Sequence, residues 1–142
     1  MEAGLNSKSF VLFLMVGVGI FLWSPTGAQE PEPAVLSPGA DGVQRGTVLM
    51  ESYSFTPHHL IVQVGQPVEL TLSNESFLVP HNFILNEPEA GLAIEENIGF
   101  GDTLTIQFTP TRTGVYPFYC DNQLLFFPSH REEGMEGHLE VR

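Results

Sequence analysis

The stretch "LIVQVGQPVELTL", residues 60–72, decides the fold. Apolar side chains occupy every second position on both sides of a short break. These positions are Leu60, Val62, Val64, Val68, Leu70 and Leu72. The break, Gly65-Gln66-Pro67, consists of residues that favour turns. Because alternation with a period of two is typical of a strand that buries one face, this stretch predicts two short β-strands joined by a turn.

The same alternation recurs further along the chain. It is visible in Leu104/Ile106/Phe108, in Tyr116/Phe118/Cys120 and in Leu139/Val141, with turn residues at 99–102 and 111–114. Short alternating runs at this spacing predict an all-β protein, built as an antiparallel β-sandwich or barrel. Residues 87–98 favour one turn of helix at most. Pro117 cannot donate a ladder hydrogen bond, so its strand is expected to be an edge or to be bulged there.

The N-terminal third divides into two segments that precede the domain. Residues 1–28 carry one cation, Lys8, then an apolar run from Phe10 to Trp23, then small residues at Thr26 and Ala28. This is the pattern of a cleaved secretory signal peptide, with an uncleaved membrane anchor as the alternative. Residues 29–45 are rich in Pro, Gly and acidic residues and are expected to form a flexible leader to a domain at 46–142. We therefore expect the protein to be periplasmic or secreted, with no stable membrane insertion after the signal is cleaved.

The charge of the chain restricts its partners. The sequence has 5 Lys+Arg and 17 Asp+Glu, a formal net charge of −12. Removal of residues 1–28 takes away Glu2 and Lys8, so the remainder keeps the same net charge. Phosphate-rich surfaces would repel such a protein, which argues against nucleic acid and anionic membranes. A cation or a basic protein is the more natural partner.

Cys120, the only cysteine, lies near other residues that bind soft metals. A single cysteine cannot form an intramolecular disulfide, which leaves a packing residue, an intermolecular bridge or a metal ligand. His130 and Met135 follow it closely, and His81 begins an earlier apolar run, "HNFIL". Two imidazoles, a thiolate and a thioether are the donors of a mononuclear copper site that needs little rearrangement on electron transfer.

The order of these pieces resembles the cupredoxins, the small blue copper proteins of the plastocyanin and azurin type. Four stretches from about Thr47 to Arg142 carry the resemblance. They are "YSFTPHHLIVQVGQPVELTLSNE" for the opening strands, "HNF" for the first ligand, "FTPTRTGVYPFYC" for the strand into the cysteine and "GMEGHLEV" for the ending. The resemblance implies a Greek-key antiparallel β-sandwich that holds one copper ion, cycling between Cu(I) and Cu(II).

The resemblance also implies a role for each site residue. His81, Cys120 and His130 would be equatorial ligands and Met135 the axial ligand, while Asn82 would tie the two ligand loops together. Nine residues separate Cys120 from His130, at or past the long end of the spacing in that family.

Other residues are assigned different roles. Glu132, Glu133 and Glu136 are the alternative source of an oxygen ligand. His58 and His59 are interpreted as surface residues and His138 as structural. The tripeptide Asn74-Glu75-Ser76 matches the acceptor pattern for N-glycosylation, a pattern short enough to occur by chance.

The function that these observations favour is that of an exported electron carrier with one type 1 copper, serving redox partner proteins, and not an enzyme. One alternative is a periplasmic copper-binding or tolerance protein that holds the ion without cycling it. Another is a small copper redox enzyme with an open coordination position. The remaining alternative is a metal-free β-sandwich domain that functions in adhesion.

An apolar segment, Leu124-Leu125-Phe126-Phe127, interrupts the loop between Cys120 and His130. Burial of one such side chain is worth about 1.5–3 kcal/mol, which argues that most of the four pack inward over the site. Exposed apolar side chains also mark interaction sites. We therefore expect two or three of the four to be buried and the rest to form a rim beside His130.

Overall fold

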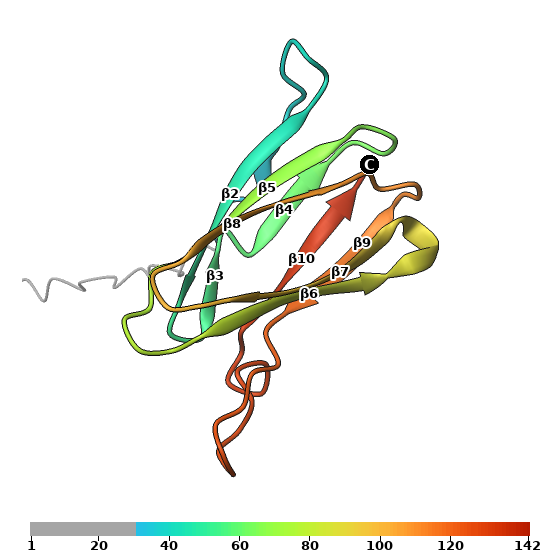
Figure 1. The fold of residues 1–142 in the computed structure, drawn as a ribbon. Helices are drawn as coiled ribbons and strands as arrows, with labels where there is room; N and C mark the ends of the chain where they lie inside the picture. The colour runs from blue at the N-terminus through green and yellow to red at the C-terminus, as the bar shows by residue number, and fades with distance from the viewer. Residues whose placement is uncertain (1–30) are drawn as a thin grey trace, which may run out of the picture.

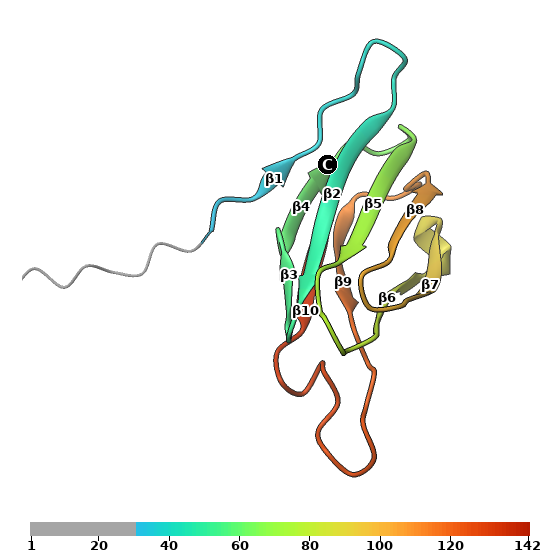
Figure 2. The same cartoon turned by 60° about the vertical axis from the view of Figure 1, so that its left-hand side comes forward.

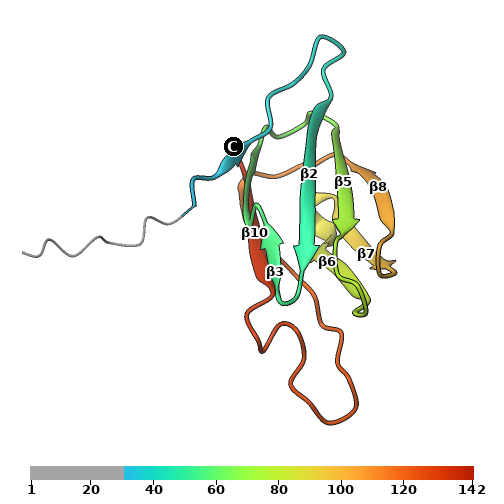
Figure 3. The same ribbon diagram turned by 90° about the vertical axis from the view of Figure 1, so that its left-hand side faces the viewer.

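The computed structural model describes residues 31–142, which form two β-sheets packed face to face (Figure 1). The six-stranded sheet has, in spatial order, β1 (Ala34–Val35), β4 (His59–Val62), β10 (Glu136–Val141), β9 (Gly114–Tyr119), β6 (His81–Glu87) and β7 (Leu92–Ile98). The four-stranded sheet, which faces the viewer in Figure 3, has β3 (Ser54–Thr56), β2 (Gln44–Glu51), β5 (Val68–Asn74) and β8 (Thr103–Phe108). The expected all-β sandwich is confirmed.

Both sheets contain parallel as well as antiparallel pairs. Strand β2 runs parallel to β5, and β4 runs parallel to both β10 and β1. The remaining pairs, such as β10 with β9 and β6 with β7, are antiparallel. Parallel neighbours need connections that leave the sheet, and here such connections pass between the two layers.

The two strands predicted from residues 60–72 both form, but they belong to different sheets. Strand β4 lies in the six-stranded sheet and β5 in the four-stranded sheet. Gly65, at a φ of 74°, adopts the left-handed conformation that the turn between them requires. Along β5, Val68, Leu70 and Leu72 point into the core and are at most 1% exposed. The alternation in the sequence therefore records which face of each strand is buried.

The core between the sheets is centred on aromatic side chains from three strands. Phe55, Phe83 and Phe118 contact one another with ring centroids 5.0 to 5.9 Å apart. Phe83 on β6 and Phe118 on β9 are fully buried, two residues from His81 and Cys120 respectively. Close packing restricts both strands, and so it fixes the places where these two site residues leave the core.

The segment expected to be a flexible leader is partly built into the fold. Within residues 31–45, β1 pairs with β4, and β2 already begins at Gln44. Leu36 is buried against Gly46, where a Cβ atom would clash with the leucine side chain. Burial of Leu36 gives this stretch a contact that its polar composition does not indicate. The expected signal, residues 1–28, lies outside the described residues. Within residues 31–142, no helix has the length and apolar character needed to cross a membrane.

The structure also tests the expectations for residues 87–98 and for the strand that contains Pro117. Residues 87–98 contain a single 3-10 turn, Pro88–Ala90, and then continue as β7. Strand β9 pairs with β10 along its whole length, whereas its ladder with β6 consists of the single pair Ile84 and Tyr119. Pro117 thus lies where β9 lacks a ladder on its β6 side, as its missing N–H requires.

Candidate metal centre

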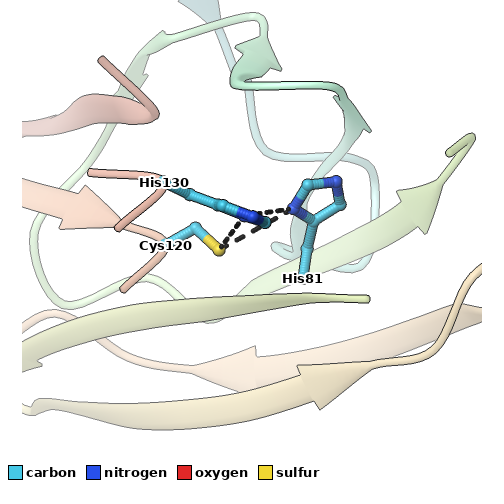
Figure 4. Close-up of side chains that lie close together, drawn as sticks. All are labelled: His81, Cys120 and His130. Atoms are coloured by element: carbon cyan, nitrogen blue, oxygen red, sulfur yellow. Dashed lines mark hydrogen bonds between the residues drawn. The ribbon is translucent and has the colours of Figure 1, made fainter. Parts of the chain in front are cut away.

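Three potential metal ligands meet at the end of the sandwich opposite the C-terminus (Figures 2 and 4). His81 is the first residue of β6, and Cys120 directly follows the last residue of β9. His130 comes from the loop between β9 and β10. The backbone N–H of His130 donates to the carbonyl oxygen of Asn122 at 2.8 Å, which turns that loop back toward Cys120. The sheet thus supplies two donors and the loop supplies the third.

The donor atoms of the three side chains face one another. Cys120 Sγ lies 3.3 Å from His130 Nδ1 and 3.7 Å from His81 Nδ1, and the two Nδ1 atoms are 3.1 Å apart (Figure 4). Each residue therefore directs one nitrogen or sulfur donor atom to a common centre. Among the described residues, this is the group of His, Cys, Asp and Glu side chains whose donors converge closely enough to hold a metal ion.

Burial determines the protonation of these groups. His81 and Cys120 are fully buried and His130 is 7% exposed. Burial, with a contribution from neighbouring His130, lowers the pKa of His81 to about 4, and burial also lowers the pKa of His130. Burial raises the pKa of the Cys120 thiol, and the backbone N–H groups of Asn82 and Asn122 partly offset that rise. At neutral pH the imidazoles are uncharged, so each has a lone pair that could bind a metal, and a bound metal would displace the thiol proton.

Met135 is buried beside this group, and its backbone joins Cys120 to His130. Its N–H donates to the carbonyl oxygen of His130 at 2.9 Å, and its own carbonyl accepts the N–H of Cys120 at 3.1 Å. The Met135 side chain is fully buried. The four residues proposed from the sequence therefore lie in one region of the fold.

The comparisons with known proteins agree with this geometry. A family profile described as a cupredoxin-like domain matches residues 12–134, most of the chain. The chain belongs to the cupredoxin-like family. Among curated proteins, none matches the sequence.

Solved structures share the cupredoxin fold. The metal-binding domain of a Cu(I)-exporting P-type ATPase from Streptococcus pneumoniae D39 has a TM-score of 0.59 and 23% identity, over 78% of this chain and 96% of that chain. Auracyanin from Roseiflexus castenholzii has a TM-score of 0.56 and 22% identity, over 73% of this chain and 99% of that one. Auracyanin A from Chloroflexus aurantiacus, a blue copper protein, has a TM-score of 0.55 and 22% identity, over 71% and 100%.

Asn82 ties together the two segments of this cupredoxin that carry the candidate ligands His81 and Cys120, as the family resemblance implies. Its side-chain oxygen accepts the N–H of Asp121 at 3.0 Å, and its side-chain nitrogen donates to the Asp121 carboxylate at 2.7 Å. Its backbone N–H points at Cys120 Sγ, 3.4 Å away. Asn82 therefore fixes the residue after His81 to the residue after Cys120.

Replacement of this residue by alanine, Asn82→Ala, is expected to lower the free energy of unfolding of the metal-free protein by about 1–3 kcal/mol, because two hydrogen bonds across the site are lost. Denaturant unfolding measures the change. Asn86→Ala is the control, since Asn86 is exposed on the same strand. Equal effects of the two substitutions would show that Asn82 does not tie the segments.

The remaining candidates lie outside the group of converging donors. Glu132 accepts hydrogen bonds from Ser129, and Glu136 pairs with Arg131 at 2.7 Å. Glu133 is exposed. These surface positions argue against the carboxylates as alternative ligands.

The three other histidines lie together on the outer face of β4 and β10. The His59 and His138 ring centroids are 4.5 Å apart, and the His58 and His138 centroids are 6.3 Å apart. His59 also lies 3.1 Å from the carboxylate of Glu140. All three are partly exposed, which agrees with a surface location for His58 and His59.

The expected division of the apolar segment is wrong. Leu124, Leu125, Phe126 and Phe127 are 67, 79, 84 and 52% exposed, so none of them packs inward. The loop that carries them projects beyond the ends of both sheets, where there is no core surface to pack against (Figure 2). The loop has a defined shape of its own. Phe127 N–H donates to the Leu124 carbonyl at 3.0 Å, and the two phenylalanine rings stack 4.9 Å apart.

Sequence reasoning missed two residues that contact the candidate ligands. Ser76 Oγ lies 2.9 Å from His81 Nε2, and the Tyr53 ring meets the His130 ring edge to face at 5.2 Å. Ser76 lies five residues before His81 in the same connection, but nothing in its local pattern marks the contact. Tyr53 is 77 residues from His130 and comes close only because the turn between β2 and β3 lies at this side of the sandwich.

Proposed function

We propose that this protein is an exported electron carrier with one type 1 copper, bound by His81, Cys120 and His130 with Met135 as the axial ligand. The observation that carries the proposal is the convergence of one thiol and two uncharged imidazoles at a buried point. Soft thiolate and imidazole donors suit copper in both of its oxidation states. When bound, copper would supply one-electron redox chemistry.

The contribution of the chain is to orient the donors and to exclude water. The Asn82 tie and the two backbone hydrogen bonds of Met135 hold the loop donors against the end of the sheet. Because His81 and Cys120 are fully buried, bulk water does not reach their donor atoms. Donors that are already in position favour electron transfer, since little must move when the charge changes.

His130 offers the route by which an electron would leave the site. It lines two surface hollows, one beside Tyr53 and Phe127 and the other beside Leu78 and Leu124. We call this surface the apolar end, and its exposed members are Phe77, Leu78, Leu124, Leu125, Phe126 and Phe127. Exposed apolar patches mark contact sites on soluble proteins, so the apolar end is the proposed contact for a redox partner. The net charge of −12 favours a basic partner.

Export is part of the proposal and rests on the sequence of residues 1–28. An N-terminal cation, a short apolar run and small residues before the expected cleavage site are the features of a secretory signal. N-terminal sequencing of the protein recovered from its native compartment tests export. A mature chain that begins near residue 29 supports a periplasmic or secreted location, and a retained Met1 in the cytoplasm contradicts it.

The copper-loaded protein provides the direct test of function. A carrier is expected to bind one copper per chain, to absorb strongly in the visible range and to give a type 1 paramagnetic resonance spectrum. It is also expected to give a reversible one-electron wave in voltammetry. A protein that binds copper without colour, or that cannot be re-oxidised, would contradict the proposal.

A copper-handling protein is the second candidate. The observation that favours it is the complete burial of Cys120 and His81, which suits tight retention of Cu(I) as well as electron transfer. A neighbour in fold is the metal-binding domain of a Cu(I)-exporting ATPase, solved with Cu(I). Tight Cu(I) binding without a reversible redox wave would favour this candidate. Binding of added azide to the copper would instead favour a small redox enzyme with an open coordination position.

The axial role of Met135 gives a separate prediction. Met135→Leu is expected to retain copper and colour but to raise the reduction potential, because a donor that helps Cu(II) is lost from a buried position. A tenfold change in the relative affinity for the two oxidation states corresponds to about 59 mV. Voltammetry measures the shift. An unchanged potential would contradict axial binding, and complete loss of copper would show that Met135 does more than tune the site.

A further inference from the structure

The two nitrogens of the His81 ring have different environments. Nδ1 faces the candidate ligands, 3.1 Å from His130 Nδ1 and 3.7 Å from Cys120 Sγ. Nε2 points away from them and lies 2.9 Å from Ser76 Oγ. The His81 side chain is fully buried, so water does not substitute for either partner.

A neutral imidazole carries one N–H, and the other nitrogen keeps the lone pair that a metal needs. If Nδ1 is the binding atom, the hydrogen must be on Nε2. A buried N–H without an acceptor is costly, so the Nε2–H form requires an acceptor at that position. Among the described residues, the side chain hydrogen-bonded to Nε2 is Ser76.

We propose that Ser76 is a positioning residue whose hydroxyl accepts the His81 Nε2–H, and that it thereby holds His81 in the tautomer that presents Nδ1 to copper. This inference rests on the proposed copper site and adds to it a residue outside the ligand set. An outer hydrogen bond of this kind fixes both the tautomer and the orientation of a ligating imidazole.

Ser76 is itself held in place by Asn74, which is 1% exposed at the end of β5. The Asn74 side-chain oxygen accepts the Ser76 backbone N–H at 2.9 Å. Its side-chain nitrogen donates to the carbonyl oxygens of Val79 and Gly99, both at 3.0 Å. One buried amide thus fixes the connection from β5 to His81 at both of its ends.

These contacts also explain the tripeptide Asn74-Glu75-Ser76. The Asn74 nitrogen that would carry a sugar is buried and donates hydrogen bonds, so the folded protein has no room for a glycan there. The buried Asn74 side chain holds the connection in place by hydrogen bonds, and Ser76, two residues later, is the proposed acceptor for His81. The spacing that matches a glycosylation pattern therefore has a structural reason in this fold.

The two imidazoles of the site differ in which ring nitrogens have side-chain hydrogen-bond partners. The side-chain hydrogen bonds of His130 within the described residues both involve Nδ1, with His81 and Cys120 as partners. His130 also lines the surface hollows of the apolar end. Loss of the Ser76 hydroxyl is therefore expected to act on His81 and to leave the His130 ring unchanged.

The tautomer can be measured without any metal. We would record long-range proton–nitrogen correlation spectra of the nitrogen-15-labelled, metal-free protein at neutral pH. The wild-type protein is expected to have His81 as the Nε2–H tautomer. Ser76→Ala is expected to shift His81 toward Nδ1–H, and Ser76→Thr, which keeps a hydroxyl, to restore the wild-type pattern. Ser73→Ala is the matched control, because the Ser73 hydroxyl contacts Glu75 and Thr103 instead of a candidate ligand.

Copper titration of the same four proteins gives the second measurement. Ser76→Ala is expected to weaken copper binding by roughly 10–100-fold, the range typical of lost outer hydrogen bonds to a metal ligand. The substitution keeps the backbone N–H that Asn74 holds, so we expect the connection to stay folded. An Nδ1–H tautomer in the wild-type protein would overturn the proposal, whatever the variants do. So would a Ser76→Ala protein with the wild-type tautomer and affinity. If the tautomers behave as expected but none of the four proteins binds copper, the proposed function is wrong, whereas the role of Ser76 in fixing the His81 tautomer is supported.

Discussion

Replacement of the single cysteine by serine, Cys120→Ser, is expected to abolish the intense visible absorption of the copper-loaded protein. That absorption arises from transfer of charge from a thiolate to Cu(II), and the chain has no second cysteine to replace the first. Cys120 Sγ is also the donor that lies within 3.7 Å of both imidazoles. Copper affinity should therefore fall by more than the roughly 10–100-fold expected for an outer hydrogen bond.

The sandwich itself is expected to survive this substitution. A serine hydroxyl is smaller than a thiol and can accept the Asn82 N–H that points at this position. Burial of a hydroxyl in place of the thiol costs about 1–3 kcal/mol, less than the whole free energy of unfolding of a typical domain. Denaturant unfolding of the metal-free wild-type and variant proteins checks this. A folded variant that keeps the visible band would overturn the assignment of the thiolate, and with it the type 1 site.

The strands were predictable because burial leaves a periodic trace in the sequence. Val68, Leu70 and Leu72 are buried as their alternation indicates, and the turn at Gly65 falls between the predicted strands. The sequence did not indicate which strands become neighbours. Alternation records the buried face of a strand and contains no information on the direction or identity of its partner, so the parallel pairs β2–β5 and β4–β10 could not be foreseen.

The site was predictable to the extent that its chemistry is rare. One cysteine with a histidine and a methionine downstream is an unusual set, and the fold does bring Cys120 and His130 to His81. Ser76 could not be found in this way, because a serine before a strand is common. Its role depends on the direction in which Nε2 of His81 points, which the sequence does not indicate. The fate of the apolar segment was mispredicted for a related reason. The burial free energy of a side chain says what burial would gain but not whether a surface exists to pack against.

The exposure of that segment leads to the last prediction. Leu124→Ser combined with Phe127→Ser is expected to slow electron transfer between copies of the copper-loaded protein by about tenfold or more. A few residues carry most of the binding free energy of an interface, and truncation of such a hot-spot residue costs about 2 kcal/mol or more. A loss of 1.4 kcal/mol is already a factor of ten. Both side chains lie beside His130 and are more than half exposed. The visible spectrum should be unchanged, because the turn of this loop is held by backbone groups that serine retains.

Electron self-exchange between reduced and oxidised copies is the appropriate measurement, because it needs no knowledge of the natural partner. Line broadening in proton spectra of mixed Cu(I) and Cu(II) samples gives the rate, at an ionic strength that screens the repulsion between two acidic proteins. Val115→Ser is the control. Val115 is 64% exposed on β9, five residues before Cys120 and so about 17 Å along the strand from the site. We expect this control to exchange at the wild-type rate, and both variants to unfold within about 0.5 kcal/mol of the wild type. If the double variant exchanged as fast as Val115→Ser, the apolar end would not be the contact surface. If its spectrum changed instead, the loop would pack on the copper site after all, and its exposure would not be a feature of the copper-loaded protein.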